Sequence, residues 1–230
     1  MKTREPKFYI VGGFVRDKIL GITSKDIDYS VEASSYADMR RAILDRGGEI
    51  FLETPEYFTI RARVPKMGAC DFVLCRKDGE YGDGRRPDNV EMGTLYDDLA
   101  RRDFTMNAIA MDEGGNYIDP FDGMKHMQER VIRSVGVAED RFNEDALRML
   151  RAIRFSVTKK MMISSEIMVQ LDKPELVEKL KNVSLERIRE EMLKAFKHDS
   201  IATLDLLEIS TPIRNAVFNT GLWLKPTLEK

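Results

Sequence analysis

One short stretch near the N-terminus constrains the fold more than any other part of the chain. The apolar run over residues 8–11 is typical of a strand, Gly12 and Gly13 turn the chain, and residues 15–20 have helical spacing. Glycine tolerates a positive φ, and without a Cβ it lets a ligand approach the backbone. The amides after the turn and the helix N-terminus make an anion site, to which Arg16 can add a charge-assisted fork. The stretch therefore predicts a strand–turn–helix unit that binds phosphate.

Two carboxylates follow this unit. Asp26 and Asp28 alternate on a segment with strand character, and residues i and i+2 on a strand share a face. Paired carboxylates beside a phosphate-binding turn suit hard divalent cations that hold a nucleoside triphosphate. Taken singly, a glycine pair is usually a plain turn and an Asp-x-Asp is usually a solvated edge. Their order and spacing together favour the functional interpretation.

Length and charge narrow the class of protein. The 230 residues suit one large domain or two small ones, and no apolar run is long enough to span a bilayer or to act as a signal peptide. Cys70 and Cys75 are too few for a disulfide framework and suit buried thiols in a reducing compartment, so we expect a cytoplasmic protein. The net charge of −2 argues against a broadly basic nucleic-acid binder. Any contact with RNA must then come from local patches.

The next segment contains strands and an isolated acid. Residues 35–46 have helical spacing, and residues 49–52, 57–64 and 69–75 are rich in β-branched and aromatic side chains, which is typical of strands. Asp71 lies inside the last strand, flanked by apolar residues. A charge in a strand centre is costly unless it is compensated. A metal shared with the two earlier carboxylates and an ordinary salt bridge are both open explanations.

A glycine-rich loop and a polar stretch come next. Residues 77–90 indicate a loop, and the arginines in it could touch phosphate, although a solvated loop tip is the commoner explanation. Asp103 and Asn107 are four residues apart, so on a helix they would share a face. A carboxylate and an amide together can hold ribose hydroxyls, and the neighbouring Arg102 can reach phosphate. The alternative is a helix with a polar stripe.

From about residue 130 the pattern is almost wholly helical. Asn143 suits the N-cap of a helix that continues through residue 155. One face of this helix carries a charged residue at every third position, namely Asp145, Arg148, Arg151 and Arg154. Such a row could form i,i+3 ion pairs on a surface. Three arginines with one acid, however, leave excess positive charge, which fits a triphosphate.

Five motifs occur in order between about Tyr9 and Ala195. They are Gly12-Gly-Phe-Val-Arg-Asp with Asp26-x-Asp28, Arg101-Arg-Asp-Phe-Thr-Met-Asn-Ala, Asp119-Pro-Phe-Asp-Gly, Glu144-Asp-Ala-Leu-Arg-Met-Leu-Arg-Ala-Ile-Arg-Phe and Ser184-Leu-Glu-Arg-Ile-Arg-Glu-Glu. In this combination the chain resembles the class II tRNA nucleotidyltransferases, the CCA-adding enzymes, and their relatives the bacterial poly(A) polymerases. The resemblance implies an α+β fold: a polymerase-β-type nucleotidyltransferase head, with a small mixed sheet and helices, over residues 1–133. An all-helical neck that recognises the nucleotide base would follow over residues 134–230.

The resemblance also implies roles for single residues. The catalytic carboxylates would be Asp26, Asp28 and Asp71, and the first two would bind magnesium in a two-metal site. The residues implied to bind nucleotide are Gly12, Gly13, Arg16, Arg102, Asp103, Asn107, Asp145, Arg148, Arg151 and Arg154.

The implied function is template-independent addition of C and A, from CTP and ATP, to tRNA 3′ ends, either as CCA addition or as repair. An A-only transferase, poly(A)-polymerase-like or A-adding, is the alternative enzyme. A nucleotide- or RNA-binding module without turnover is the alternative from another class. Two departures from the family bear on these expectations. Body and tail domains that grip tRNA are absent from this sequence, so dimerisation, a partner protein or a smaller RNA would compensate. His126 also stands where relatives often carry an acid.

Overall fold

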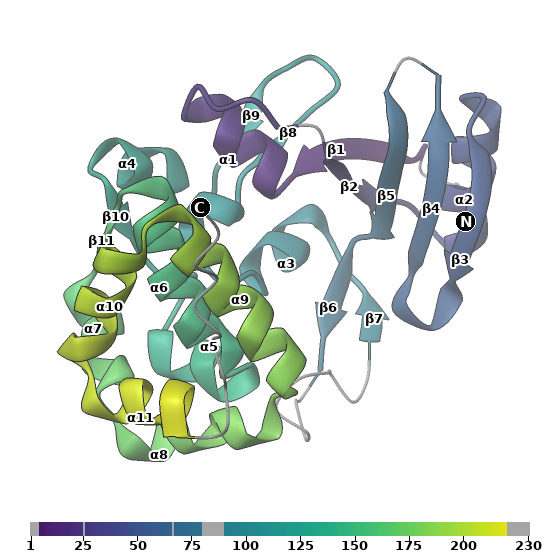
Figure 1. Ribbon diagram of the computed structural model, residues 1–230. Coiled ribbons are helices and arrows are strands. Elements are labelled where there is room, and N and C mark those ends of the chain that lie inside the picture. The colour runs from purple at the N-terminus through teal and green to yellow at the C-terminus, as the bar shows by residue number, and fades with distance from the viewer. Residues whose placement is uncertain (1–4, 25, 66, 80–89, 220–230) are drawn as a thin grey trace, which may run out of the picture. The chain divides into compact units, whose positions relative to one another are not determined.

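The protein consists of two compact units. The computed structural model describes residues 5–24, 26–65, 67–79 and 90–219 (Figure 1). Of these residues, those up to 127 belong to the first unit and those from 128 onward belong to the second. The division after residue 127 precedes the domain boundary that the sequence predicted after residue 133. The predicted loop arginines, Arg85 and Arg86, lie outside the described residues.

A seven-stranded mixed sheet organises the first unit, in the order β3-β4-β5-β2-β1-β8-β9 (Figure 1). Strands β2 and β5 run parallel, and the other neighbours are antiparallel. The strands are β1 (Lys7–Val11), β2 (Ile27–Glu32), β3 (Glu49–Thr54), β4 (Thr59–Val64), β5 (Gly68–Leu74), β8 (Ala110–Met111) and β9 (Tyr117–Ile118). The short strands β6 (Arg76–Asp78) and β7 (Val90–Met92) pair separately.

Side-chain alternation gives this sheet two different faces. On β2, Tyr29 and Val31 point into the hydrophobic core, where Phe72 of β5 stacks on Tyr29 with ring centroids 4.9 Å apart. Helix α2 (Tyr36–Asp45) covers that face and buries Met39 among these residues. Because successive strand residues point to opposite faces, the polar residues that alternate with Tyr29 and Val31 point to the other face. The candidate site lies on that face.

The remaining helical elements of the first unit are short. They are α1 (Gly13–Ile19), the 3-10 turn η1 (Pro55–Tyr57), α3 (Leu95–Ala100), the 3-10 turn η2 (Thr105–Asn107) and α4 (Gly123–Gln128). Helix α3 begins with a capping box, in which the Thr94 side chain accepts from the Asp97 amide and the Asp97 carboxylate accepts from the Thr94 amide. The predicted helix 35–46 is confirmed as α2, and the Ser35 hydroxyl caps it.

The second unit is helical, apart from a parallel pair between β10 (Val131–Ile132) and β11 (Met162–Ile163). Its helices are α5 (Ala138–Glu144), α6 (Leu147–Lys159), α7 (Ser165–Leu171), α8 (Pro174–Val177), the 3-10 helix η3 (Glu178–Asn182), α9 (Leu185–His198), α10 (Ser200–Ile209) and α11 (Thr211–Asn219). Helices α6 and α9 pack against each other (Figure 1). Their apolar faces bury Leu150, Ile153 and Met192.

The expected helix start at Asn143 is wrong. Asn143 lies in the last turn of α5, the backbone is extended at Asp145 (φ −146°, ψ 104°), and α6 starts at Leu147. The Asp145 Oδ1 atom accepts from the Leu147 amide at 3.0 Å. The carboxylate thus satisfies one of the amide donors that a helix N-terminus leaves without an intrahelical partner, which explains a break between two helices at this position.

The described residues bear on two expectations that came from the composition. Both Cys70 and Cys75 are free and buried, as predicted. Across the described ranges, no helix combines the length and the apolar character that crossing a membrane requires.

Candidate functional site

The glycine turn predicted to bind phosphate lies between β1 and α1. Gly12 has φ 70° and ψ −132°, a backbone conformation that side chains with a Cβ rarely adopt. A Cβ at Gly12 would lie 3.1 Å from Nη1 of Arg102 and 3.9 Å from Oδ2 of Asp28. The last residue of β1, Val11, pairs with Asp28 on β2. The turn therefore brings together a bare backbone, the Arg102 guanidinium and the Asp28 carboxylate, whereas Arg16, the arginine expected at the turn, lies near the next glycine, where a Cβ at Gly13 would be 3.6 Å from its Nη2.

The strand register aligns charged residues across the same face of the sheet. Asp28 on β2 pairs with Asp71 on β5, and Asp71 pairs in turn with Arg61 on β4. The Arg61 guanidinium forms an ion pair with Asp71 at 2.7 Å. The salt bridge that the sequence left open for Asp71 is therefore present. Asp26 lies immediately before β2 rather than on it, because the strand begins at Ile27.

The electrostatics of this face act mainly on Asp28. Partial desolvation and then repulsion by Asp71 and Asp26 raise the pKa of the Asp28 carboxyl, against the opposing charges of Arg102 and Arg61. A cation bound among these acids would offset that repulsion.

Within the described ranges, no three His, Cys, Asp or Glu side chains gather closely enough to hold a metal ion. Magnesium is commonly held by one or two carboxylates together with substrate phosphates. Asp26 and Asp28 fit that smaller donor set, since both are exposed acids that interact electrostatically.

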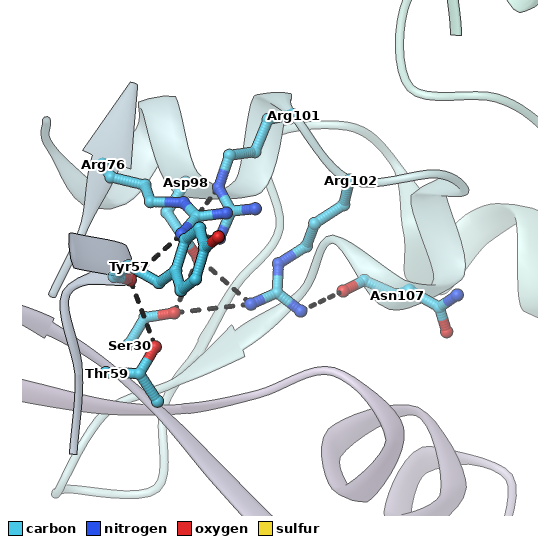
Figure 2. Close-up of polar contacts among 8 residues, drawn as sticks. All are labelled: Ser30, Tyr57, Thr59, Arg76, Asp98, Arg101, Arg102 and Asn107. Atoms are coloured by element: carbon cyan, nitrogen blue, oxygen red, sulfur yellow. Dashed lines mark hydrogen bonds and ion pairs between the residues drawn. The ribbon is translucent and has the colours of Figure 1, made fainter. Parts of the chain in front are cut away.

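A buried carboxylate anchors the arginine at the turn (Figure 2). Asp98 is 0% exposed and accepts from Ser30 Oγ at 2.6 Å, Arg101 Nη2 at 2.6 Å and Arg102 Nη2 at 3.0 Å. Burial alone would raise the pKa of Asp98, but Arg102 and Arg101 outweigh it and hold this pKa well below its usual range. Arg102 also donates through Nη1 to the Asn107 carbonyl at 3.2 Å. These bonds fix the guanidinium beside Gly12.

Arg16 is fixed by a second network. It is 8% exposed and donates through Nε to Asp17 at 2.8 Å and through Nη1 to Asn107 Oδ1 at 2.7 Å. The Asn107 amide nitrogen donates to Asp103 Oδ1 at 2.8 Å. The structure therefore brings Arg16, Asp103 and Asn107 together as candidates for phosphate and ribose.

Asp103 and Asn107 do not lie on a common helix, so the helical alternative for this stretch is wrong: a 3-10 turn (η2) begins only at Thr105. The Asp103 carboxylate accepts from the Phe104 amide at 2.8 Å, and the backbone at Phe104 is extended. The two side chains still meet, but through a turn rather than along a helix face.

The sequence analysis missed Asp17, Ser30 and Asp98 of this site, and also Arg61, the partner of Asp71. Two of them, Ser30 and Asp98, had a signal in the sequence. Ser30 lies two residues after Asp28 on the same strand and so shares its face. Asp98 lies four residues before Arg102, the spacing of an ion pair on a helix. The Asp17 carboxylate follows Arg16 directly, and no periodicity marks it.

The charged residues predicted to lie on one helix face belong to the second unit, and their partners differ from those expected. They are Asp145, Arg148, Arg151 and Arg154. The Arg148 amide donates to the Asp145 carbonyl at 3.0 Å, while the described partners of the two charged side chains are other residues. Asp145 Oδ2 accepts from Arg187 Nη2 at 3.0 Å. Arg148 Nη1 donates to Glu144 Oε2 at 2.7 Å and to the Arg141 carbonyl at 3.2 Å. Arg187, on α9, is a further residue that sequence reasoning did not place here.

The excess of positive charge along α6 is smaller than the sequence of this helix alone predicts. Glu191 of α9 is buried and forms ion pairs with Arg154 and, at 3.7 Å, with Arg151. The Arg154 guanidinium also lies 3.9 Å from the centroid of the Phe155 ring. The two arginines are thus partly neutralised by a buried acid that lies more than 30 residues away in the sequence. The expectation of three arginines facing one acid is wrong, because α9 supplies another.

Comparison with known proteins gives matches over both units. The family described as the poly A polymerase head domain matches residues 8–133. The CCA-adding enzyme of Ligilactobacillus salivarius is 38% identical over 200 residues, which cover 84% of this chain and 46% of the relative. The chain thus spans about half the length of the curated relatives that it matches.

Solved structures agree with this result. The crystal structure of the Bacillus stearothermophilus CCA-adding enzyme in complex with CTP matches with a TM-score of 0.77 and 33% identity, covering 89% of this chain and 48% of that one. A tRNA nucleotidyltransferase complexed with a primer tRNA and an incoming ATP analog matches with a TM-score of 0.75 and 28% identity, covering 95% and 61%. The predicted fold class, a mixed-sheet head followed by helices, is confirmed.

Proposed function

The chain belongs to the family of the poly A polymerase head domain, and from that premise we propose that it adds C and A nucleotides, from CTP and ATP, to tRNA 3′ ends. The support is the similarity to the CCA-adding enzyme of L. salivarius and to structures solved with CTP and with a primer tRNA and an ATP analog. The reaction is in-line attack of the RNA 3′-hydroxyl on the α-phosphate. A new O–P bond forms, and the bond to pyrophosphate breaks.

The observation that carries this proposal is the shared face of Gly12, Asp28 and Arg102. Asp26 and Asp28 would hold Mg²⁺, with substrate phosphate oxygens completing the shell. Bound there, Mg²⁺ would neutralise phosphate charge and lower the pKa of the attacking hydroxyl. Asp28 lies within reach of the glycine turn, which offers its amides to the same phosphates. The role of Asp71 as a third catalytic carboxylate stays a prediction, because its described partner is Arg61.

The bare backbone at Gly12 and Gly13 and the guanidinium groups of Arg16 and Arg102 would bind the triphosphate. Both guanidinium groups are held by carboxylates before any ligand arrives, Arg16 by Asp17 and Arg102 by Asp98. Such preorganisation lowers the reorganisation that binding costs. Asp103 and Asn107, which bond to each other, would hold the ribose hydroxyls.

Base selection is proposed for Asp145 and Arg148. Cytosine and adenine each present an exocyclic amine beside a ring-nitrogen acceptor, so a carboxylate next to a guanidinium complements both. Guanine and uracil would place a carbonyl oxygen against the carboxylate, a contact between two acceptors. Each Asp145 oxygen accepts one described bond, from Leu147 or Arg187, and each carboxylate oxygen has a second lone pair for the base. Arg151 and Arg154 would lie near the bound nucleotide.

The proposal also includes the compartment in which the protein acts and the partners that help it to hold tRNA. The two buried free thiols suit a reducing compartment, so we place the reaction in the cytoplasm. That a second copy of the chain or a partner protein helps to hold the tRNA stays a prediction.

The direct test uses the purified chain with labelled CTP or ATP and tRNAs that end before C, after CC, or after CCA. We expect CMP and AMP addition that stops at CCA and that EDTA abolishes and added Mg²⁺ restores. Long A tails would favour the A-only transferase, and binding of labelled nucleotide without incorporation would favour the silent module. Incorporation at full rate in EDTA would contradict the metal assignment alone.

Substitution of Asp145 by asparagine tests the base assignment. Because the amide nitrogen can donate where the carboxylate only accepts, we expect UTP and GTP incorporation to rise relative to CTP and ATP. The selectivity should fall by about 10- to 100-fold, the effect of one mismatched buried hydrogen bond. Asp140→Asn, at an exposed position on α5, is the matched control and should leave selectivity unchanged. Unaltered selectivity in Asp145→Asn would remove Asp145 from base reading.

A further inference from the structure

Helix α4 packs directly on the 3-10 turn η2. A Cβ built at Gly123, the first residue of α4, would lie 2.2 Å from the Thr105 carbonyl oxygen, so no larger residue fits there without moving the turn. The Asp119 carboxylate accepts from the Gly123 and Met124 amides, each at 2.8 Å, and thereby holds the start of the helix. The position of α4 and the position of Thr105 therefore depend on each other.

One side chain on α4 reaches the same residue. The Nδ1 atom of His126 lies 3.0 Å from the Thr105 hydroxyl, which is a hydrogen bond whose direction depends on the imidazole tautomer. Thr105 is 4% exposed, and His126 is half-buried. Thr105 thus contacts α4 in two ways: its carbonyl packs closely against Gly123, and its hydroxyl forms a hydrogen bond with His126.

The other end of η2 contacts both arginines assigned to the triphosphate. Asn107 accepts from Arg16 Nη1 at 2.7 Å through its side chain and from Arg102 Nη1 at 3.2 Å through its carbonyl. Thr105 and Asn107 belong to one buried 3-10 turn, so a shift of one moves the other.

We propose that His126 is a positioning residue for the triphosphate site. By holding Thr105, it sets the place of Asn107 and, through Asn107, the place of the Arg16 and Arg102 guanidinium groups. This inference rests on the proposed function, since it takes these two arginines as ligands of the nucleotide. It also gives a role to a histidine at a position where the motif resemblance led us to expect an acid.

The kinetic test compares three variants. His126→Leu removes the hydrogen bond, His126→Asn keeps an amide near the place of Nδ1, and Thr105→Val removes the hydroxyl with little change of shape. We expect His126→Leu and Thr105→Val each to raise the KM for CTP about three- to tenfold, the effect of one hydrogen bond, with kcat within about twofold. His126→Asn should restore much of the loss. The double variant should be no worse than either single variant, because both remove the same bond.

A second measurement needs no variant. The chain contains two histidines, and the other, His198, is an exposed residue at the end of α9. NMR spectra of the two imidazoles during a CTP titration therefore give a signal with an internal reference. Because coupling between two sites is reciprocal, CTP binding should shift the His126 resonances and leave those of His198 in place.

The outcomes separate this inference from the proposed function. A wild-type chain that neither binds CTP nor incorporates it would overturn both. Normal wild-type activity, together with an unchanged KM in His126→Leu or Thr105→Val and static His126 resonances at saturating CTP, would overturn the positioning role alone. If His126→Leu fails to fold, Thr105→Val and the wild-type titration still decide the question.

Discussion

Replacing Asp28 by asparagine is expected to abolish nucleotide addition while making the folded chain more stable. We expect CMP incorporation to fall about a thousandfold, the effect of several kcal/mol of transition-state stabilisation. The loss follows from the place of Asp28, which faces the glycine turn beside Asp71 and Arg102. Single-turnover incorporation of labelled CMP is the measurement.

The gain in stability has a separate cause. The fold raises the pKa of Asp28, so the ionised carboxylate destabilises the folded state relative to the unfolded chain. This cost is absent at acid pH and appears as the pH rises through the folded-state pKa. Asparagine carries no charge, so the Tm of the variant should exceed that of the wild type at neutral pH and converge with it as the pH falls.

Asp45→Asn is the matched control for charge, because Asp45 is exposed at the end of α2. It should leave both incorporation and Tm close to the wild-type values. Loss of activity together with a lower Tm in Asp28→Asn would contradict the expected result, since it would indicate a misfolded sheet rather than a missing carboxylate.

The second large effect is expected at Asp98. Asp98→Asn removes the buried charge that faces Arg101, Arg102 and the Ser30 hydroxyl. Breaking one partner of a buried ion pair costs about 3–5 kcal/mol, which corresponds to a fall in Tm of about 10 °C for a chain of this size. We also expect a higher KM for CTP, because Arg102 would lose the anchor that holds it beside Gly12. Thermal unfolding and steady-state kinetics measure the two effects.

The pH dependence of stability gives an independent readout for Asp98. The fold lowers the pKa of this carboxyl, so its contribution is present above the ordinary value of about 4 and is lost as the pH falls toward the lowered folded-state value. The difference in stability between wild type and Asp98→Asn should therefore shrink in acid. A constant difference down to low pH would contradict the assignment.

The neighbouring residue provides the control. Asp97→Asn changes the same type of side chain on the same helix, but the described hydrogen bonds of the Asp97 carboxylate are the cap bonds from Thr94. The expected cost is about 1 kcal/mol, the usual value for a cap. Equal losses for the two variants would mean that the buried network at Asp98 adds nothing to an ordinary helix cap.

Local patterns in the sequence predicted the elements that hold the first unit together. Gly12 between an apolar run and a helical segment marked the turn, and the structure has the positive φ expected there. The Asp26-x-Asp28 pattern predicted a strand, and Asp28 lies on β2, although the strand begins at Ile27, after Asp26. Such features depend on residues that are close in sequence, so periodicity and turn chemistry are enough to find them.

Where local rules failed, an unexpected side-chain bond accompanied the failure. Asn143 has the chemistry of an N-cap, but the carboxylate of Asp145 bonds to the Leu147 amide and starts the helix later. Asp103 and Asn107 have helical spacing, yet Asp103 bonds to the adjacent Phe104 amide, and a 3-10 turn follows. A side chain that competes for backbone amides can shift an element boundary by several residues.

By itself, the sequence determined the family motifs, the mixed-sheet head with its helical continuation, and the residue types at the glycine turn. Only the tertiary structure decided the partners of the charges. Arg61 pairs with Asp71, Arg187 with Asp145, and Glu191 with Arg154. The physical reason is that an ion pair depends on distance in space, and these partners lie far apart in the sequence, where the register of the sheet and the packing of α6 and the residues before it on α9 bring them together.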